Sequence, residues 1–195
     1  MGLDMFLFRA KRQPNKTFND IKEIESKLGN QKCTEKELEE LKPFIFEEGS
    51  TETFKWKSLY HEIGYWRKAN QIHQWFVDNV QAGEDDCGVY IVPKEKAEEL
   101  LDICKKVYDS LKDAELVEKT MYDKWNNEEY THKVFADKDT EIAEDLLPTQ
   151  EGFFFGGTEY DEYYLEDIER TIKQLRNVLV DFDFENNYLL YHSSW

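Results

Sequence analysis

Cysteine and histidine are scarce in this chain of 195 residues, and neither follows a metal-site or disulfide pattern. The three cysteines, Cys33, Cys87 and Cys104, are odd in number and form no C-x-x-C pair, which argues against a disulfide framework and a zinc ribbon. His61-Glu62 is not followed by the second histidine of H-E-x-x-H, so a zinc protease of that type is excluded. The sequence therefore predicts no metal and no other cofactor, and it fits a reducing cytoplasm.

Long apolar runs are also missing. No stretch approaches the roughly 20 apolar residues that span a bilayer. The start, MGLDMF, lacks the basic and apolar regions of a secretory signal, and Phe6 stands where a myristoylation signal needs serine or threonine. We therefore expect a cytoplasmic protein that does not bind membranes.

Basic residues are few relative to acidic ones. The chain has 25 Lys and Arg against 42 Asp and Glu, and its net charge is -17. Such a surface repels phosphate backbones, so we expect no direct binding of DNA or RNA. Solubility alone explains this charge, and imitation of a nucleic acid toward a protein partner explains it as well.

Catalytic motifs are absent from the sequence too. It contains no G-x-S-x-G or other nucleophile motif, and Cys104 falls within an apolar helical stripe. A binding protein is therefore favoured over an enzyme, and an enzyme without a recognised motif stays open. Self-association into a homo-oligomer stays open as well.

The apolar patterns predict an α+β fold. Alternating and helical spacings interleave along the chain, which favours a mostly antiparallel sheet with helices packed on it. We expect a single compact domain over residues 1–195, with peripheral insertions at 30–52 and 112–136. Strands are expected at residues 3–9, 89–92, 115–135 (as a hairpin) and 187–195, and a strand or extended segment at 53–60. Helices are expected at residues 19–28, 35–42, 62–79, 97–111, 141–147 and 160–180.

The stretch EIGYWRKANQIHQWFVDN (residues 62–79) concentrates aromatic, basic and amide side chains. At 100° per residue its apolar side chains fill an arc of about 180°, which predicts a helix with one face in the core. Asn70 and His73 lie inside that arc, where each needs hydrogen-bond partners. They hydrogen-bond either to backbone groups of a neighbouring element or to a ligand in a pocket beside Trp66. Trp75 lies opposite the core by this projection and is covered by another element or open to a planar ligand.

The segment GFFFGGTEYDEYY (residues 152–164) predicts a buried strand, a tight turn and the start of a helix. Gly156 and Gly157 allow positive φ and close backbone approach, and a helix N-terminus attracts anions. Thr158 with Asp161 resembles a capping box, and the acidic residues there repel a phosphate. A pocket wall of aromatic side chains is therefore favoured over a phosphate loop.

Four segments of the chain resemble an uncharacterised family of small bacteriophage and prophage proteins. They are MGLDM at the start, YWRKANQIHQWF (65–76), GEDDCG (83–88) and LLPTQEGFFFGGTEYDEYY (146–164). The resemblance implies no catalytic residue, and the kinase label that some members carry finds no kinase motif here. A phage origin implies a protein in the host cytoplasm that acts by binding, either on a nucleotide-type defence signal or on a host protein.

These observations lead to one favoured function and two alternatives. The favoured function is non-enzymatic sequestration of a small nucleotide-like ligand between the YWRKAN helix and the GFFFGG turn. The alternatives are an acidic inhibitor that blocks a host protein and an unrecognised enzyme. The favoured function assigns ligand binding to Tyr65, Trp66, Arg67, Lys68, Asn70, His73, Trp75, Phe155, Gly156, Gly157, Thr158 and Tyr160.

Overall fold

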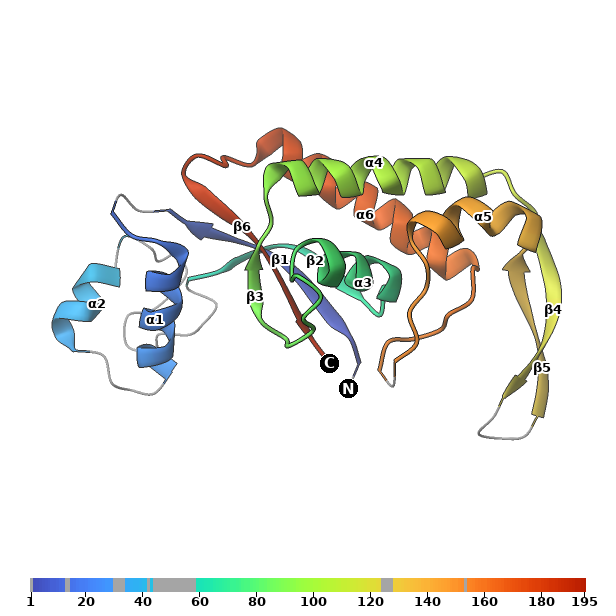
Figure 1. Ribbon diagram of the computed structural model, residues 1–195, viewed down its shortest axis with the longest axis horizontal. Coiled ribbons are helices and arrows are strands. Elements are labelled where there is room, and N and C mark those ends of the chain that lie inside the picture. Colours follow the sequence, from blue (N-terminus) through green and yellow to red (C-terminus); the bar gives the residue numbers. More distant parts are fainter. Residues whose placement is uncertain are drawn as a thin grey trace.

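The computed structural model describes residues 2–12, 15–29, 34–41, 43, 59–123, 128–152 and 154–195. Figure 1 shows helices packed on antiparallel strands, which confirms the predicted α+β class. The strands are β1 (Asp4–Lys11), β2 (His61–Arg67), β3 (Val89–Ile91), β4 (Leu116–Asp123), β5 (Glu128–Phe135) and β6 (Asn187–Ser194). The helices are α1 (Phe18–Gly29), α2 (Glu35–Leu41), α3 (Asn70–Asn79), α4 (Lys94–Leu111), α5 (Asp137–Leu146) and α6 (Glu162–Asp181).

Within the described residues, four strands form one antiparallel sheet in the order β2-β1-β6-β3. The strands nearest the two ends of the chain, β1 and β6, therefore lie at its centre. Met5 pairs with Trp66 of β2 on one side and with Ser193 of β6 on the other. The sheet thus joins segments that are far apart in the sequence.

Side chains alternate between the two faces of the sheet along the central strands, so the molecule has two hydrophobic cores, one on each face. Met5 and Leu7 of β1 belong to the larger core, while Phe8 and Ala10 belong to the smaller one. The helices α3, α4 and α6 contribute to the larger core, and α1 covers the smaller one through Phe18 and other side chains. In Figure 1, α4 and α6 run side by side, and α5 lies beside them.

The apolar stripes of the two long helices match the sequence prediction. Leu100, Cys104 and Val107 of α4 are fully buried, as are Ile168 and Leu175 of α6. The helical period of 3.6 residues places them on one face. No described helix is long and apolar enough to cross a membrane.

The edge strand β2 is partly capped by a side chain of α6. Gln174 accepts a hydrogen bond from the Tyr65 N–H (2.7 Å) and donates one to the Tyr65 carbonyl (3.1 Å). Its amide thus does locally what a further strand would do. A Cβ on Gly64 would lie 2.5 Å from Gln174 Oε1, so the glycine leaves room for this contact.

The strands β4 and β5 form a separate hairpin, as the pattern at 115–135 predicts. Figure 1 shows it extending at one end of the molecule, and the Phe135 N–H bonds to the Tyr160 carbonyl near its base (2.8 Å). Its predicted turn at residues 126–127 lies outside the described residues. Residues 53–58 of the predicted strand or extended segment also lie outside the described residues, as does most of the segment 30–52, of which the structure describes 34–41 and 43. The predicted insertions and the single domain therefore stay predictions.

The helix predicted over residues 62–79 is wrong in its first part. Residues 61–67 form β2, paired with β1, and the helix α3 begins at Asn70. Lys68 separates the two with a left-handed φ of 62°, and its N–H bonds to the Leu3 carbonyl (2.8 Å). Short aromatic segments satisfy both the strand and the helix period, and here pairing with a distant strand decides the outcome. The buried strand predicted at GFFFGG is likewise wrong: residues 154–157 form a turn and loop.

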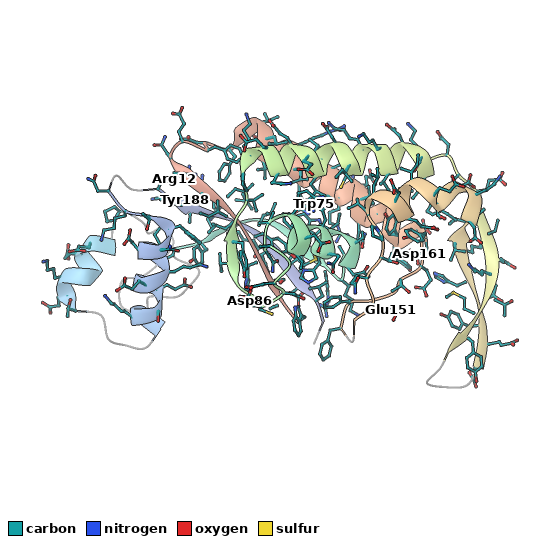
Figure 2. All side chains as sticks on the ribbon, viewed as in Figure 1. Arg12, Trp75, Asp86, Glu151, Asp161 and Tyr188 are labelled. Carbon is teal, nitrogen blue, oxygen red and sulfur yellow. The ribbon has the colours of Figure 1, made fainter. Side chains whose placement is uncertain are left out.

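Trp75 does not lie on an open face, because a second element covers it. Its exposed fraction is 6%, its ring meets Phe76 edge to face (5.4 Å between centroids), and Lys96 Nζ of α4 lies 5.9 Å from the ring centroid. Figure 2 shows the side chain between α3 and α4. Both sides of α3 are therefore covered, one by the sheet and one by α4.

Replacing Trp75 by Ala is expected to lower the free energy of unfolding by roughly 3–5 kcal/mol, because it empties a buried volume. Urea denaturation measures this change. Tyr122→Ala, at a side chain that is 57% exposed on β4, is the control and should cost under about 1 kcal/mol. A loss at Trp75 as small as the loss at Tyr122 would contradict the covered position.

Candidate ligand-binding site

A hollow of about 440 Å³ lies where the β2–α3 junction, the loop after α5, the strand β5 and the first half of α6 meet. Its size falls within the usual range for small-molecule sites. Five of the residues assigned from the sequence line it: Arg67, Lys68, Asn70, Gly156 and Gly157. It is also lined by Gln71, Tyr130, His132, Thr149, Glu159, Asp161, Tyr163, Tyr164, Glu166, Asp167 and Arg170.

Lys68 and Gly156 bring two backbones into close approach at the rim of this hollow. Gly156 has a φ of +95°, and a Cβ there would lie 3.1 Å from Lys68 Cβ and 3.4 Å from the Lys68 carbonyl oxygen. A side chain at this position would be strained and crowded. The glycine therefore lets the loop dock directly on the β2–α3 junction.

Asn70 of α3 makes three side-chain hydrogen bonds, all of them to the loop that precedes α6. Its Nδ2 donates to the carbonyls of Phe155 (3.2 Å) and Gly157 (2.8 Å), and its Oδ1 accepts from the Gln150 N–H (2.8 Å). The residue is buried, and these bonds satisfy groups that would otherwise cost about 1–3 kcal/mol. Asn70 therefore shapes the hollow.

Three basic side chains reach the hollow without a salt bridge. Among the described residues, Arg67, Lys68 and Arg170 have no carboxylate within ion-pair distance. In the same part of the chain, the backbone N–H groups of Gly156 and Gly157 have no acceptor. In a chain of net charge -17, this is a local excess of basic side chains without a salt bridge beside one cavity.

Asp161 organises the opposite wall and begins α6. Its Oδ1 accepts from the Tyr164 N–H (2.9 Å), so it is the N-cap of the helix in place of the predicted Thr158. Its Oδ2 lies 2.8 Å from His132 Nε2 of β5. Figure 2 shows Asp161 at the end of α6 nearest the hairpin. The carboxylate is thus committed to the protein, and it ties the hairpin to the helix.

Asp167 and Gln71 form the inner part of the hollow. Burial raises the pKa of Asp167 to about 6, although the positive charge of Arg170 opposes the shift and the Gln71 amide lowers the pKa too. Gln71 is 3% exposed, and its Nε2 still has no acceptor at hydrogen-bonding distance among the described residues. The Gln71 amide and the Asp167 carboxylate therefore face each other where α3 and α6 meet.

Several residues assigned from the sequence lie away from the hollow, in the core. Trp66 is buried and donates from Nε1 to Thr171 Oγ1 (2.8 Å), and Trp75 is packed as described above. Phe155 packs edge-on against His73 (5.1 Å between centroids). These contacts favour structural roles for the buried side chains.

The remaining three assigned residues lie outside the hollow as well. Tyr65 is on the other face of the sheet beside Phe6 (5.3 Å between ring centroids). Thr158 and Tyr160 line a neighbouring hollow of about 280 Å³ between the hairpin and α5. The structure therefore gathers five of the assigned residues and disperses the others.

His73 joins three separate parts of the chain. Its Nδ1 lies 2.8 Å from the Tyr191 hydroxyl and its Nε2 lies 3.1 Å from Asp85 Oδ2. Because a carboxylate accepts only, the neutral ring donates from Nε2 and accepts from the tyrosine hydroxyl. Asp85 also accepts from Trp195 Nε1 (3.1 Å). The histidine therefore holds the GEDDCG turn and β6 on α3.

The described residues contain no group of three or more His, Cys, Asp or Glu that could hold a metal ion. Comparison of the chain with protein-family models, with curated proteins and with solved structures finds no match. The resemblance to bacteriophage proteins accordingly stays a prediction. The function is argued below from the residues of the hollow.

His73 should make stability fall in mild acid. Burial lowers its pKa from 6.5, against the opposing hydrogen bond and charge of Asp85. The histidine therefore binds a proton more readily in the unfolded chain than in the folded one. The stability that neutral His73 contributes is full above pH 6.5 and is lost as the pH falls. His73→Gln should therefore show a smaller drop in unfolding free energy between pH 7.5 and 5.5 than the wild type. Equal drops in urea titrations would contradict a neutral buried ring.

Asp167 should act in the opposite direction. Its pKa is raised in the folded state, so the stability that it contributes is present at low pH and is lost as the pH rises through about 6. Asp167→Asn should be more stable than the wild type at pH 8, and the difference should shrink toward pH 5. Glu141→Gln, at an exposed carboxylate of α5, is the control and should change stability little at either pH. If the effect of Asp167→Asn on the free energy of unfolding were the same at both pH values, a raised pKa of the Asp167 carboxyl would be contradicted.

Proposed function

We propose that this protein binds a small nucleotide-like ligand in the hollow between the β2–α3 junction and the Gly156–Gly157 turn. The observation that carries the proposal is the convergence of three basic side chains without a salt bridge, and of two free backbone N–H groups, on one cavity. Arg67, Lys68 and Arg170 form no salt bridge with a described residue, and the backbone N–H groups of Gly156 and Gly157 have no acceptor among those residues. An anionic ligand with acceptor atoms would satisfy all of them.

The charge of the lining supports a ligand with two unlike ends. Three basic residues face four acidic ones there, whereas acids outnumber bases strongly in the whole chain. A purely anionic ligand would meet the carboxylates of Glu159 and Glu166. A nucleotide combines a phosphate, which suits arginine and lysine, with a base that offers N–H donors to carboxylates.

Aromatic side chains at the rim support a planar group in the ligand. Tyr163 is 70% exposed and Tyr130 is 44% exposed, and both line the hollow. A ring stacked on such a side chain gains about 1–3 kcal/mol, and the protein does not have to open a core to provide it. Sequestration of a host defence signal, as the bacteriophage resemblance implies, would be the biological role, and that part of the proposal rests on the resemblance.

Thermal-shift measurements and isothermal titration calorimetry with a panel of linear and cyclic nucleotides test the proposal. A ligand at about 100 times its Kd adds about 2.7 kcal/mol, which corresponds to a rise in Tm of roughly 5–10 °C for a chain of this size. Arg67→Ala and Arg170→Ala should each weaken binding roughly 10- to 100-fold, because each removes a charged hydrogen bond.

Arg176→Ala is the matched control, since Arg176 lies on α6 beside a different hollow. It should leave the affinity unchanged. The absence of any nucleotide-induced shift, or equal losses in Arg176→Ala and Arg170→Ala, would overturn the proposal. Chromatography of the ligand after incubation separates the alternatives, because sequestration returns the ligand intact and an enzyme does not.

A further inference from the structure

Two aromatic side chains line the hollow from different walls and have no partner of their own. Tyr130 belongs to β5 and is 44% exposed, and Tyr163 belongs to the first turn of α6 and is 70% exposed. Among the described residues, neither side chain makes a hydrogen bond, and neither ring contacts another ring or a cation. Each therefore offers a flat apolar face to a ring of a ligand.

The walls that carry these two rings are joined by a hydrogen bond close to both. His132 Nε2 of β5 lies 2.8 Å from Asp161 Oδ2, and Asp161 also accepts from the Tyr164 N–H (2.9 Å). Tyr130 is two residues from His132, so it lies on the same face of the hairpin, and Tyr163 is two residues from Asp161. The two walls are therefore held in place before a ligand enters, which lowers the cost of binding.

The inner polar side chains of the hollow are committed to other groups of the protein. The Gln71 amide faces the Asp167 carboxylate, and the Asn70 side chain is bonded to the loop that precedes α6. Thr149 Oγ1 donates to the Thr158 carbonyl (2.9 Å). Strong discrimination between bases requires buried polar groups that pair with one base and stay unpaired with another. These committed side chains do not supply such groups.

Glu159 and Glu166 are the lining carboxylates that have no salt bridge with a described residue and no hydrogen bond to one. Glu166 is exposed and Glu159 is half-buried, so both side chains keep rotational freedom. Every nucleobase carries at least one N–H donor, and a mobile carboxylate can accept from donors at different positions. The two glutamates therefore suit bases in general.

We infer that Tyr130 and Tyr163 hold the ring of the ligand by stacking, and that the hollow accepts nucleotides with little preference among the bases. This inference rests on the proposed nucleotide binding and specifies how the base is held. Stacking tolerates every base because every base has a π-face, and a purine gains more than a pyrimidine because its ring system is larger. Selection then lies at the anionic end of the ligand, toward Arg67, Lys68 and Arg170.

Isothermal titration calorimetry of the full chain with AMP, GMP, UMP and ribose 5-phosphate tests this inference. AMP and GMP should have affinities within about tenfold of each other, and UMP should bind more weakly than both. Ribose 5-phosphate keeps the sugar and the phosphate and lacks the base. It should bind roughly 5- to 150-fold more weakly than AMP, which is the range expected for the loss of one stacked base.

Substitution of the two tyrosines separates stacking from other contributions. Tyr130→Ala and Tyr163→Ala should each lower the affinity for AMP by about fivefold or more, because each removes a stacking face. Both should leave the affinity for ribose 5-phosphate unchanged, since that ligand has no ring to stack. Tyr130→Phe and Tyr163→Phe keep the ring and should bind both ligands as the wild type does.

Tyr122→Ala is the matched control, because Tyr122 is an exposed tyrosine on the opposite face of the same hairpin from Tyr130. It should change neither affinity. Circular dichroism and Tm verify that the variants are folded, and the binding of ribose 5-phosphate verifies that their anionic subsite is intact.

The outcomes separate this inference from the proposed function. If AMP, GMP and UMP do not bind, the stacking inference fails, and the proposed function fails with it when cyclic nucleotides do not bind either. If AMP and GMP differ by more than about tenfold, or if both alanine variants keep the wild-type ratio of AMP to ribose 5-phosphate affinity, stacking fails and nucleotide binding stands. A ratio that falls toward one in the alanine variants and is unchanged in Tyr122→Ala supports the inference.

Discussion

The pairing of β1 with strands from distant parts of the chain is the constraint on which the rest of the molecule depends. β1 receives β2 on one edge and β6 on the other. Its pairing with β2 ends at the Asp4–Arg67 pair, and the left-handed Lys68 then turns the chain into α3. Because α3 starts there, Asn70 faces the loop that follows α5, and Gln71 faces α6. The hollow is thus a consequence of where one strand pairing stops.

Burial and charge act against each other around this hollow. The larger core removes apolar side chains from water and stabilises the fold, at about 25 cal/mol per Å² of buried apolar surface. The same packing partly desolvates Asp167 and holds His73 neutral, each of which costs stability at some pH. Asp167 penalises the folded state at neutral pH and His73 penalises it in mild acid. The hydrogen bond from Gln71 and the charge of Arg170 offset part of the cost for Asp167.

Local patterns could predict the helices and central strands, since each is set by its own period. The stripe through Leu100 and Cys104 and the stripe through Ile168 and Leu175 repeat every three or four residues, and the structure buries all four. The segment 62–67 could not be assigned this way. The structure buries alternate residues of this segment, as in a strand, yet the aromatic residues of so short a segment also fit a helix. Only the pairing with β1, some 60 residues earlier, distinguishes the strand from the helix.

The hollow was partly predictable for the same reason. Arg67 and Lys68 stand out in the sequence as basic residues within an aromatic segment, and Gly156 and Gly157 stand out as a glycine pair before a helix. Local patterns were therefore enough to predict these four residues. Asp167 and His132 look like ordinary solvated residues of a helix and a hairpin until the fold brings them together. The position of Trp75 stayed open for a related reason: a helical projection locates one buried face, and α3 has two, because α4 covers the side away from the sheet.

The walls of the hollow are held by contacts that exist without any ligand. Asn70 is fully bonded to the loop, Gly156 docks against Lys68, and Asp161 is committed to both α6 and His132. A ligand therefore has little backbone to order, and ordering is a main cost of binding. Arg67, Lys68, Arg170 and the two glycines line the same hollow. Rigid walls of this kind discriminate between anionic ligands by hydrogen-bond pattern, because the walls cannot adjust to relieve a mismatch.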